Sequence, residues 1–110
     1  MERLVKGDVV VLPFPFSDLS AVKKRPALVV TVLPGDDFIL AQITSRERQD
    51  AYAIRLEKDD FQEGGLPVVS NVRPNKLFTA DRIILDYVAG HLRPGPLSRV
   101  VDEVCRIIRT

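Results

Sequence analysis

The chain has 110 residues, the length of one typical domain, and its 16 basic and 15 acidic residues leave a net charge of +1. This balance excludes a polycation that binds nucleic acid through a global field, so any such binding requires a local basic patch. A single cysteine, Cys105, excludes an internal disulfide framework and a cysteine-based zinc site. With no signal-peptide region or membrane-spanning apolar run, we expect one cytoplasmic domain across Met1–Thr110.

Short runs rich in valine, isoleucine and phenylalanine, separated by Pro, Gly, Asp and Asn, predict strands along the first three-quarters of the chain. In the fourth run, apolar and other residues alternate with a period of two, which indicates one buried face. The segment EKDDFQEGG that follows it predicts a polar loop or a single helical turn. The predicted strands are Asp8–Phe14, Ala27–Leu33, Phe38–Thr44, Ala51–Leu56, Val68–Val72, Leu77–Thr79 and Arg82–Val88.

The last segment, LSRVVDEVCRIIRT, predicts a helix, with Ser98 as its N-cap and two prolines separating it from the strands. Six or seven short strands and one terminal helix favour a bent, barrel-like antiparallel sheet with the helix over one open face. The apolar residues at helical spacing are Leu97, Val100, Val101, Val104 and Ile108.

Four segments occur in series: KGDVVVLPFPFSD, KKRPALVV, ILAQITS and SNVRPNKLFTADRI. Together they resemble the MazF/PemK family of toxin ribonucleases, from Lys6 to about Ile84, and the helix that follows also fits. The resemblance implies a mainly β fold, an SH3-like barrel with a C-terminal helix. It also implies a type II toxin–antitoxin system as the setting.

Arg25 lies in KKRPALVV, immediately before a predicted core strand. Pro26 biases Arg25 towards extended backbone, so the guanidinium is held at a strand entry, and its planar fork matches phosphate geometry. From composition alone, a solvated loop charge beside Lys23 and Lys24 is the alternative. The resemblance implies that Arg25 is the catalytic arginine.

Thr44 ends the predicted strand FILAQIT, where a residue of good β-propensity needs no further explanation. The resemblance implies that Thr44 sits at the active site and helps to position the phosphate. Ser45 is an adjacent hydroxyl that could substitute for it.

The segment VRPNKLFT brings Arg73 and Lys76 close together in the sequence, either as phosphate contacts or as exposed charges of a turn. Of the two phenylalanines in the segment KGDVVVLPFPFSD, we expect Phe14 to lie in the core and Phe16 to stack an unpaired base. The stretches 17–24 and 46–50 flank the two catalytic candidates and are the expected places for base discrimination. The candidate RNA contacts are Phe16, Lys24, Ser45, Arg46, Arg73 and Lys76.

His91 is the only histidine, which excludes a two-histidine acid–base mechanism. The pairs Asp36–Asp37 and Asp59–Asp60 are typical of turns, and the chain has neither an HExxH motif nor a glycine-rich phosphate loop. The sequence therefore supports no metal or nucleotide cofactor. Cys105 is interpreted as a small core or interface residue rather than a nucleophile.

The resemblance implies sequence-selective, metal-independent cleavage of single-stranded RNA, in which the ribose 2′-OH attacks the adjacent phosphorus. Arg25 would stabilise the developing charge and Thr44 would orient the phosphate. The implied partners are a second copy of the chain and an antitoxin with an acidic, disordered tail. Two alternatives remain at this point: a non-catalytic RNA- or protein-binding barrel, and a family member that retains only antitoxin binding.

Overall fold

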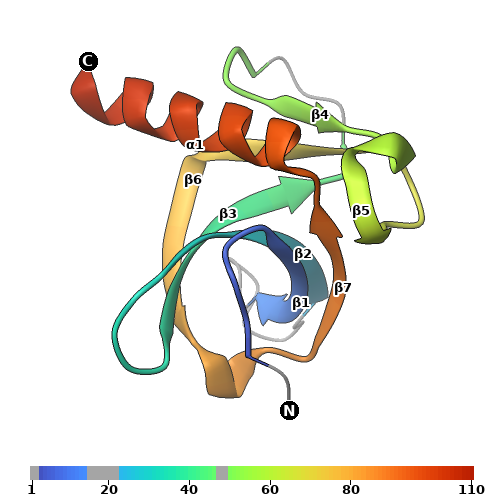
Figure 1. Cartoon of the computed structure of the whole chain (residues 1–110), viewed down its shortest axis with the longest axis vertical. Coiled ribbons are helices and arrows are strands. Elements are labelled where there is room, and N and C mark those ends of the chain that lie inside the picture. Colours follow the sequence, from blue (N-terminus) through green and yellow to red (C-terminus); the bar gives the residue numbers. More distant parts are fainter. Residues whose placement is uncertain (1–2, 15–22, 47–49) are drawn as a thin grey trace.

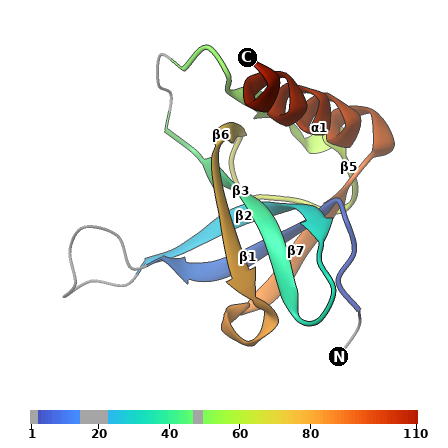
Figure 2. The ribbon, with the colours of Figure 1, turned by 90° about the vertical axis from the view of Figure 1, so that its left-hand side faces the viewer.

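A computed structural model describes residues 3–14, 23–46 and 50–110 of the chain. Within them, seven strands form one antiparallel sheet in the order β4-β6-β3-β2-β1-β7-β5, which curls around β1 (Figure 1). One α-helix, α1 (Pro94–Arg109), lies across an open side of the curled sheet and contacts β6 (Figure 2). The strands are β1 (Asp8–Phe14), β2 (Lys23–Val32), β3 (Asp37–Thr44), β4 (Ile54–Leu56), β5 (Phe61–Gly64), β6 (Ser70–Asp81) and β7 (Tyr87–Leu92).

Two clusters of buried residues lie on opposite faces of the central strands. Val9 of β1 belongs to the cluster that includes Val100 and Val104 of α1, whereas Val10 belongs to the other cluster with Leu40 of β3. Successive residues of a strand point to opposite faces, so β1 is buried on both sides. This explains why β1 reads as a nearly continuous apolar run rather than an alternating one.

The mainly β prediction with one C-terminal helix is confirmed, and the bounds of β1 agree with it. β2 starts at Lys23 instead of Ala27, because the residues before Ala27 pair with β1. The two predicted strands between Val68 and Thr79 are one strand, β6, and a register shift between Ala41 and Gln42 of β3 accommodates its irregular middle.

Three predicted segments differ in detail from the structure. Only Ile54–Leu56 of the fourth predicted strand is extended, because a turn precedes it. The polar segment after it contains the expected helical turn, η1 (Lys58–Asp60), and also strand β5, which the sequence analysis missed. The predicted strand Arg82–Val88 begins instead with a helical turn, η2 (Arg82–Ile84), and the extended backbone of β7 follows it.

The helix starts earlier than predicted, so the assignment of Ser98 as N-cap was wrong. Arg93 is the N-cap, and Pro94 occupies the first helical position, where its missing N–H costs no hydrogen bond. Cys105 is exposed, so a place in the core was also wrong. Ile108 is exposed as well, and helix α1 meets the core through Leu97, Val100, Val101 and Val104.

Gly64 fixes the end of β5 against β7 and leads into the loop that precedes β6. A Cβ added at Gly64 would lie 2.2 Å from the carbonyl oxygen of Ala89, and its φ of 62° is unfavourable for other residues. Gly35, with φ of 87° and open space around it, is a matched control for the backbone effect alone. We predict that Gly64→Ala lowers the free energy of unfolding by at least about 2 kcal/mol more than Gly35→Ala does, as measured by urea denaturation. Equal losses would show that the close approach of β5 to β7 is unimportant.

Candidate active site

Strands β2 and β3 separate at one end of the sheet. Their pairing starts with Ala27 opposite Gln42, immediately after Pro26, which has no N–H to donate. Before that point, β2 continues to pair with β1 as far as Lys23 opposite Phe14, while β3 continues along β6 to Thr44 opposite Asn71. The two strand ends therefore follow different neighbours and leave space between them.

A cavity of about 430 Å³ occupies this region. One part of its wall is cationic and comes from the start of β2 and the residues after β3. Another part is apolar and comes from the segment between β5 and β6, together with β1 and β7. The residues that line the cavity are Val11, Lys23, Lys24, Arg25, Pro26, Ile43, Thr44, Ser45, Arg46, Leu66, Pro67, Val68, Ser70 and Tyr87.

Arg25 is partly buried at this cavity, and its Nε is shielded from solvent. Arg25 lies opposite Leu12 of β1, and Leu12 is fully packed in the core. The strand alternation also places Arg25 on the face of the sheet that carries Gln42 and Thr44, since Ala27 and Gln42 are direct partners. Arg25 and Thr44 therefore lie on the same face of the sheet and line the same cavity.

Thr44 is only 6% exposed, yet it lines the same cavity. Its Oγ1 accepts a hydrogen bond of 3.2 Å from the backbone N–H of Arg46, which fixes the turn that ends β3. A hydroxyl that accepts in this way still carries a proton to donate, so Thr44 is equipped to contact a phosphate oxygen. Ser45 and Arg46 follow it with exposed side chains.

Lys24 forms an exposed ion pair with Asp86, with Nζ 2.7 Å from Oδ2. The hydrogen bond to Asp86 and the charge of that carboxylate raise the pKa of Lys24, so the ammonium stays protonated at neutral pH. Any anion that approaches Lys24 has to compete with Asp86 for it.

Arg73 and Lys76, predicted together as RNA contacts, occupy different places. Arg73 is bound to Asp50, with Nε 3.0 Å from Oδ2 and side chains only 15% and 8% exposed, so the reading of Arg73 as an exposed turn charge was wrong. Lys76 lines a separate cavity of about 370 Å³ on the Phe14 and Phe78 side of the sheet. Phe14 belongs to the core as predicted, whereas Phe16 lies outside the described residues.

Asp50 stabilises the turn that precedes β4. Its Oδ1 accepts a hydrogen bond from the backbone N–H of Tyr52, and this bond, followed by the contact with Arg73, lowers the pKa of Asp50. Thr44 and Arg46 border the same small cavity as Asp50 and Arg73. The Asp50–Arg73 pair therefore lies next to Thr44 and Arg46, which also line the larger cavity at the strand ends.

His91 lies outside the cavity at the ends of β2 and β3: its Nδ1 is 2.9 Å from Oδ1 of Asp8, at the start of β1. Within the three described ranges, no group of three His, Cys, Asp or Glu side chains is arranged to hold a metal ion. In the same ranges, no helix is long and apolar enough to cross a membrane.

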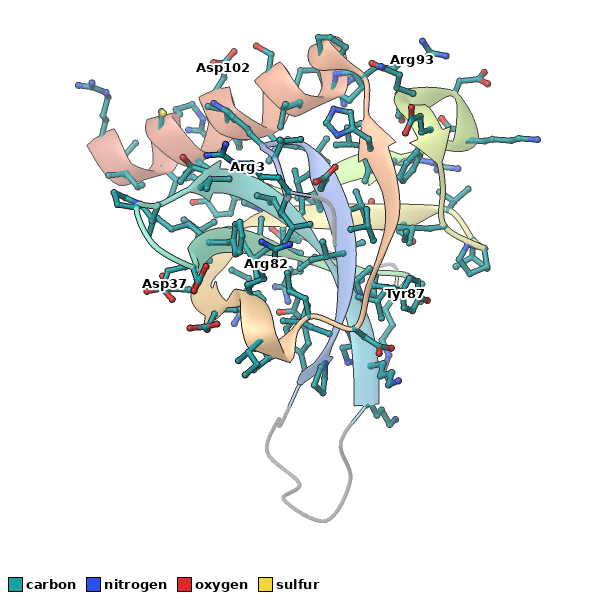
Figure 3. All side chains as sticks on the ribbon, turned by 60° about the horizontal axis from the view of Figure 1, so that its bottom comes forward. Arg3, Asp37, Arg82, Tyr87, Arg93 and Asp102 are labelled. Atoms are coloured by element: carbon teal, nitrogen blue, oxygen red, sulfur yellow. The ribbon has the colours of Figure 1, made fainter. Side chains whose placement is uncertain are left out.

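Tyr87 is a cavity residue that the sequence analysis did not identify. It begins β7, pairs with Val11 and is 56% exposed. Figure 3 shows it at the start of β7, well separated from Asp37 and Arg82. Tyr87 falls within the predicted strand Arg82–Val88. The pairing of β7 with β1 brings it to the cavity, and this long-range pairing cannot be predicted from the local sequence.

The comparison with known proteins agrees with the overall fold. A family model described as the PemK-like, MazF-like toxin of type II toxin–antitoxin systems matches residues 5–108. A mycobacterial endoribonuclease solved with its cognate antitoxin has a similar fold, with a TM-score of 0.77 and 14% identity over 97% of this chain and 96% of that one. MazF from Deinococcus radiodurans has a TM-score of 0.76 and 19% identity over 100% of both chains. The Mycobacterium tuberculosis toxin MazF-mt6 has a TM-score of 0.71 and 18% identity over 93% and 96%. No protein with a curated description matches the chain.

The low pKa of Asp50 makes its contribution to stability depend on pH. A carboxylate whose pKa is lower in the folded state stabilises the fold above its usual pKa of 3.8, and this contribution is lost as the pH falls through the folded-state value. We predict that Asp50→Asn lowers the free energy of unfolding at pH 7 by about 1.5–3 kcal/mol, because Arg73 loses its charged partner. In urea titrations at several pH values, the difference from wild type should shrink below pH 3.8. A difference that is the same at pH 7 and under acidic conditions would contradict this electrostatic role.

Proposed function

This chain belongs to the PemK-like, MazF-like toxin family of type II toxin–antitoxin systems, and we propose that it is a sequence-selective endoribonuclease that cleaves single-stranded RNA. The observation that carries the proposal is the cavity at the separated ends of β2 and β3, where Arg25 and Thr44 come together. The endoribonuclease activity named for the structurally similar mycobacterial proteins supports the same reaction.

The substrate supplies the nucleophile in the proposed reaction. The ribose 2′-OH attacks the adjacent phosphorus and gives up its proton to water, the bond from phosphorus to the 5′-oxygen breaks, and the departing oxygen takes a proton from water. A cyclic phosphate and a 5′-hydroxyl result. Arg25 stabilises the negative charge that develops on the phosphate oxygens. A guanidinium remains protonated at neutral pH and is therefore a poor base, so the role of Arg25 is electrostatic. Thr44 orients the phosphate for in-line attack.

The charges around the cavity suit an RNA backbone even though the whole chain is nearly neutral. Lys23, Lys24 and Arg46 line the cavity together with Arg25, so four cationic side chains gather at one end of the sheet. A partly buried guanidinium in such a setting interacts more strongly with a phosphate than an arginine in bulk water does. The local patch required by a net charge of +1 is therefore present.

The proposal includes two protein partners and a location. A second copy of the chain and an antitoxin with an acidic segment would bind it, as the antitoxin does in the mycobacterial complex. We place the protein in the cytoplasm, where its RNA substrates are. Ser45, Arg46 and Lys24 are proposed RNA contacts at the cavity, and Arg73 is proposed as a support for them.

The reaction is tested by incubating the purified protein with a long RNA, mapping the new 5′ ends, and then replacing single nucleotides of a short substrate. We predict cleavage that persists in excess EDTA and stops when the nucleotide on the 5′ side of the scissile bond carries a 2′-deoxy sugar, because that substitution removes the nucleophile. Efficient cleavage of the 2′-deoxy substrate, or strict dependence on added magnesium, would refute the mechanism. Binding without any cleavage would favour the non-catalytic barrel.

The role of Arg25 is tested separately by substitution. We predict that Arg25→Ala lowers kcat at least about a hundredfold, because one preorganised charge donor is lost, while the fold is retained. Arg25→Lys should recover only part of the rate, since an ammonium lacks the planar fork of the guanidinium. Arg99→Ala, at an exposed position of α1, is the matched control for removing an arginine. Near wild-type cleavage by Arg25→Ala would show that the active site lies elsewhere.

A further inference from the structure

The cavity joins a cationic wall to an apolar one, and only the cationic wall is used by the chemistry proposed above. The apolar wall includes Tyr87, which is 56% exposed, and Val68, which is 57% exposed. Tyr87 belongs to neither buried cluster, so packing in the core does not explain why an aromatic ring lies half exposed beside the cationic wall.

The strand register fixes where this ring lies. Tyr87 is opposite Val11, and Val11 is opposite Pro26, so the three share one face across β7, β1 and β2. Arg25, the neighbour of Pro26, lies on the other face, and both Arg25 and Tyr87 line the cavity at the end of the sheet where β2 no longer pairs with β3. Lys24 is two residues from Pro26 on β2 and reaches Asp86, the residue next to Tyr87. A cationic group and an exposed aromatic ring are therefore adjacent at the rim of the cavity.

We propose that Tyr87 stacks an unpaired base of the bound RNA, next to the nucleotide whose phosphate meets Arg25. This inference rests on the endoribonuclease function proposed above and assigns a specificity-determining residue to it. Single-stranded nucleic acids are held by this combination of aromatic faces for bases and positive charges for the backbone. Lys24 supplies the charge beside the stacked nucleotide, and the apolar side chains of Pro67 and Val68 line the same cavity.

An acidic peptide segment is the other occupant that a cationic cavity attracts, but RNA explains the wall better. An acidic peptide needs only the cationic side chains to bind. An exposed ring flanked by apolar side chains, in contrast, matches the flat face of a base. The tests below include the outcome expected for a peptide site.

Steady-state cleavage of a mapped RNA substrate gives the first test. Tyr87→Ala should raise KM by about 5- to 150-fold with a much smaller change in kcat, and Tyr87→Phe should restore most of the lost affinity, because the ring rather than the hydroxyl binds. Tyr52→Ala is the matched control, since Tyr52 is the only other tyrosine and its ring lies near Arg106, away from the cavity. The proposal would be overturned if folded Tyr87→Ala had an unchanged KM. It would also be overturned if Tyr87→Ala bound the antitoxin more weakly while its KM for RNA stayed the same.

Tyrosine fluorescence gives a second test that does not depend on cleavage. The chain has no tryptophan and two tyrosines, so in Tyr52→Phe the emission comes from Tyr87 alone. A 2′-O-methyl RNA of the cleaved sequence, which cannot react, should quench this emission as it binds. Binding by fluorescence anisotropy of labelled RNA without quenching would overturn the base-stacking site while leaving the endoribonuclease proposal intact. Quenching in a protein that cleaves no RNA would support the site and refute the proposed catalysis. Absence of any binding would overturn both.

Discussion

Pro26 is the point on which the candidate site depends. A proline has no N–H to donate, and the pairing of β2 with β3 starts only at the next residue, Ala27. β2 nevertheless continues for three more residues along β1. The cavity lies in the space that this one-sided pairing leaves between β2 and the end of β3, so a feature of the backbone decides where the charged side chains collect.

The groups around that space come from parts of the chain that only the folded sheet brings together. β2 contributes Arg25, the end of β3 contributes Thr44, the residues after it contribute Arg46, and β7 contributes Tyr87. Arg25 lies opposite Leu12 of the core, and the residues around Arg46 lie next to the partly buried pair of Asp50 and Arg73. The rigid strands therefore carry the residues proposed to bind phosphate, and the curled sheet holds them at fixed separations.

The sequence was most informative where a local pattern has one physical meaning. The apolar run of Asp8–Phe14 and the helical spacing of Leu97, Val100, Val101 and Val104 predicted the right elements. The family resemblance pointed to Arg25 and Thr44, and these two residues line one cavity. Phe61–Gly64 was missed because its extended backbone depends on pairing with β7, and only Phe61 among its four residues is apolar. Arg73 and Lys76 were grouped by their nearness in sequence, yet the irregular middle of β6 sends them to different cavities. The importance of Tyr87 could not be predicted either, because its register with Val11 is a long-range property.

The central claim is that RNA binds at the separated ends of β2 and β3. The most direct measurement is the change in backbone amide NMR chemical shifts of the ¹⁵N-labelled protein on addition of a non-cleavable 2′-O-methyl RNA. The account predicts that the largest changes fall at Arg25, Thr44 and Arg46. Changes concentrated instead at the opposite end of these strands, in the turn at Asp36 and in η2, would contradict it.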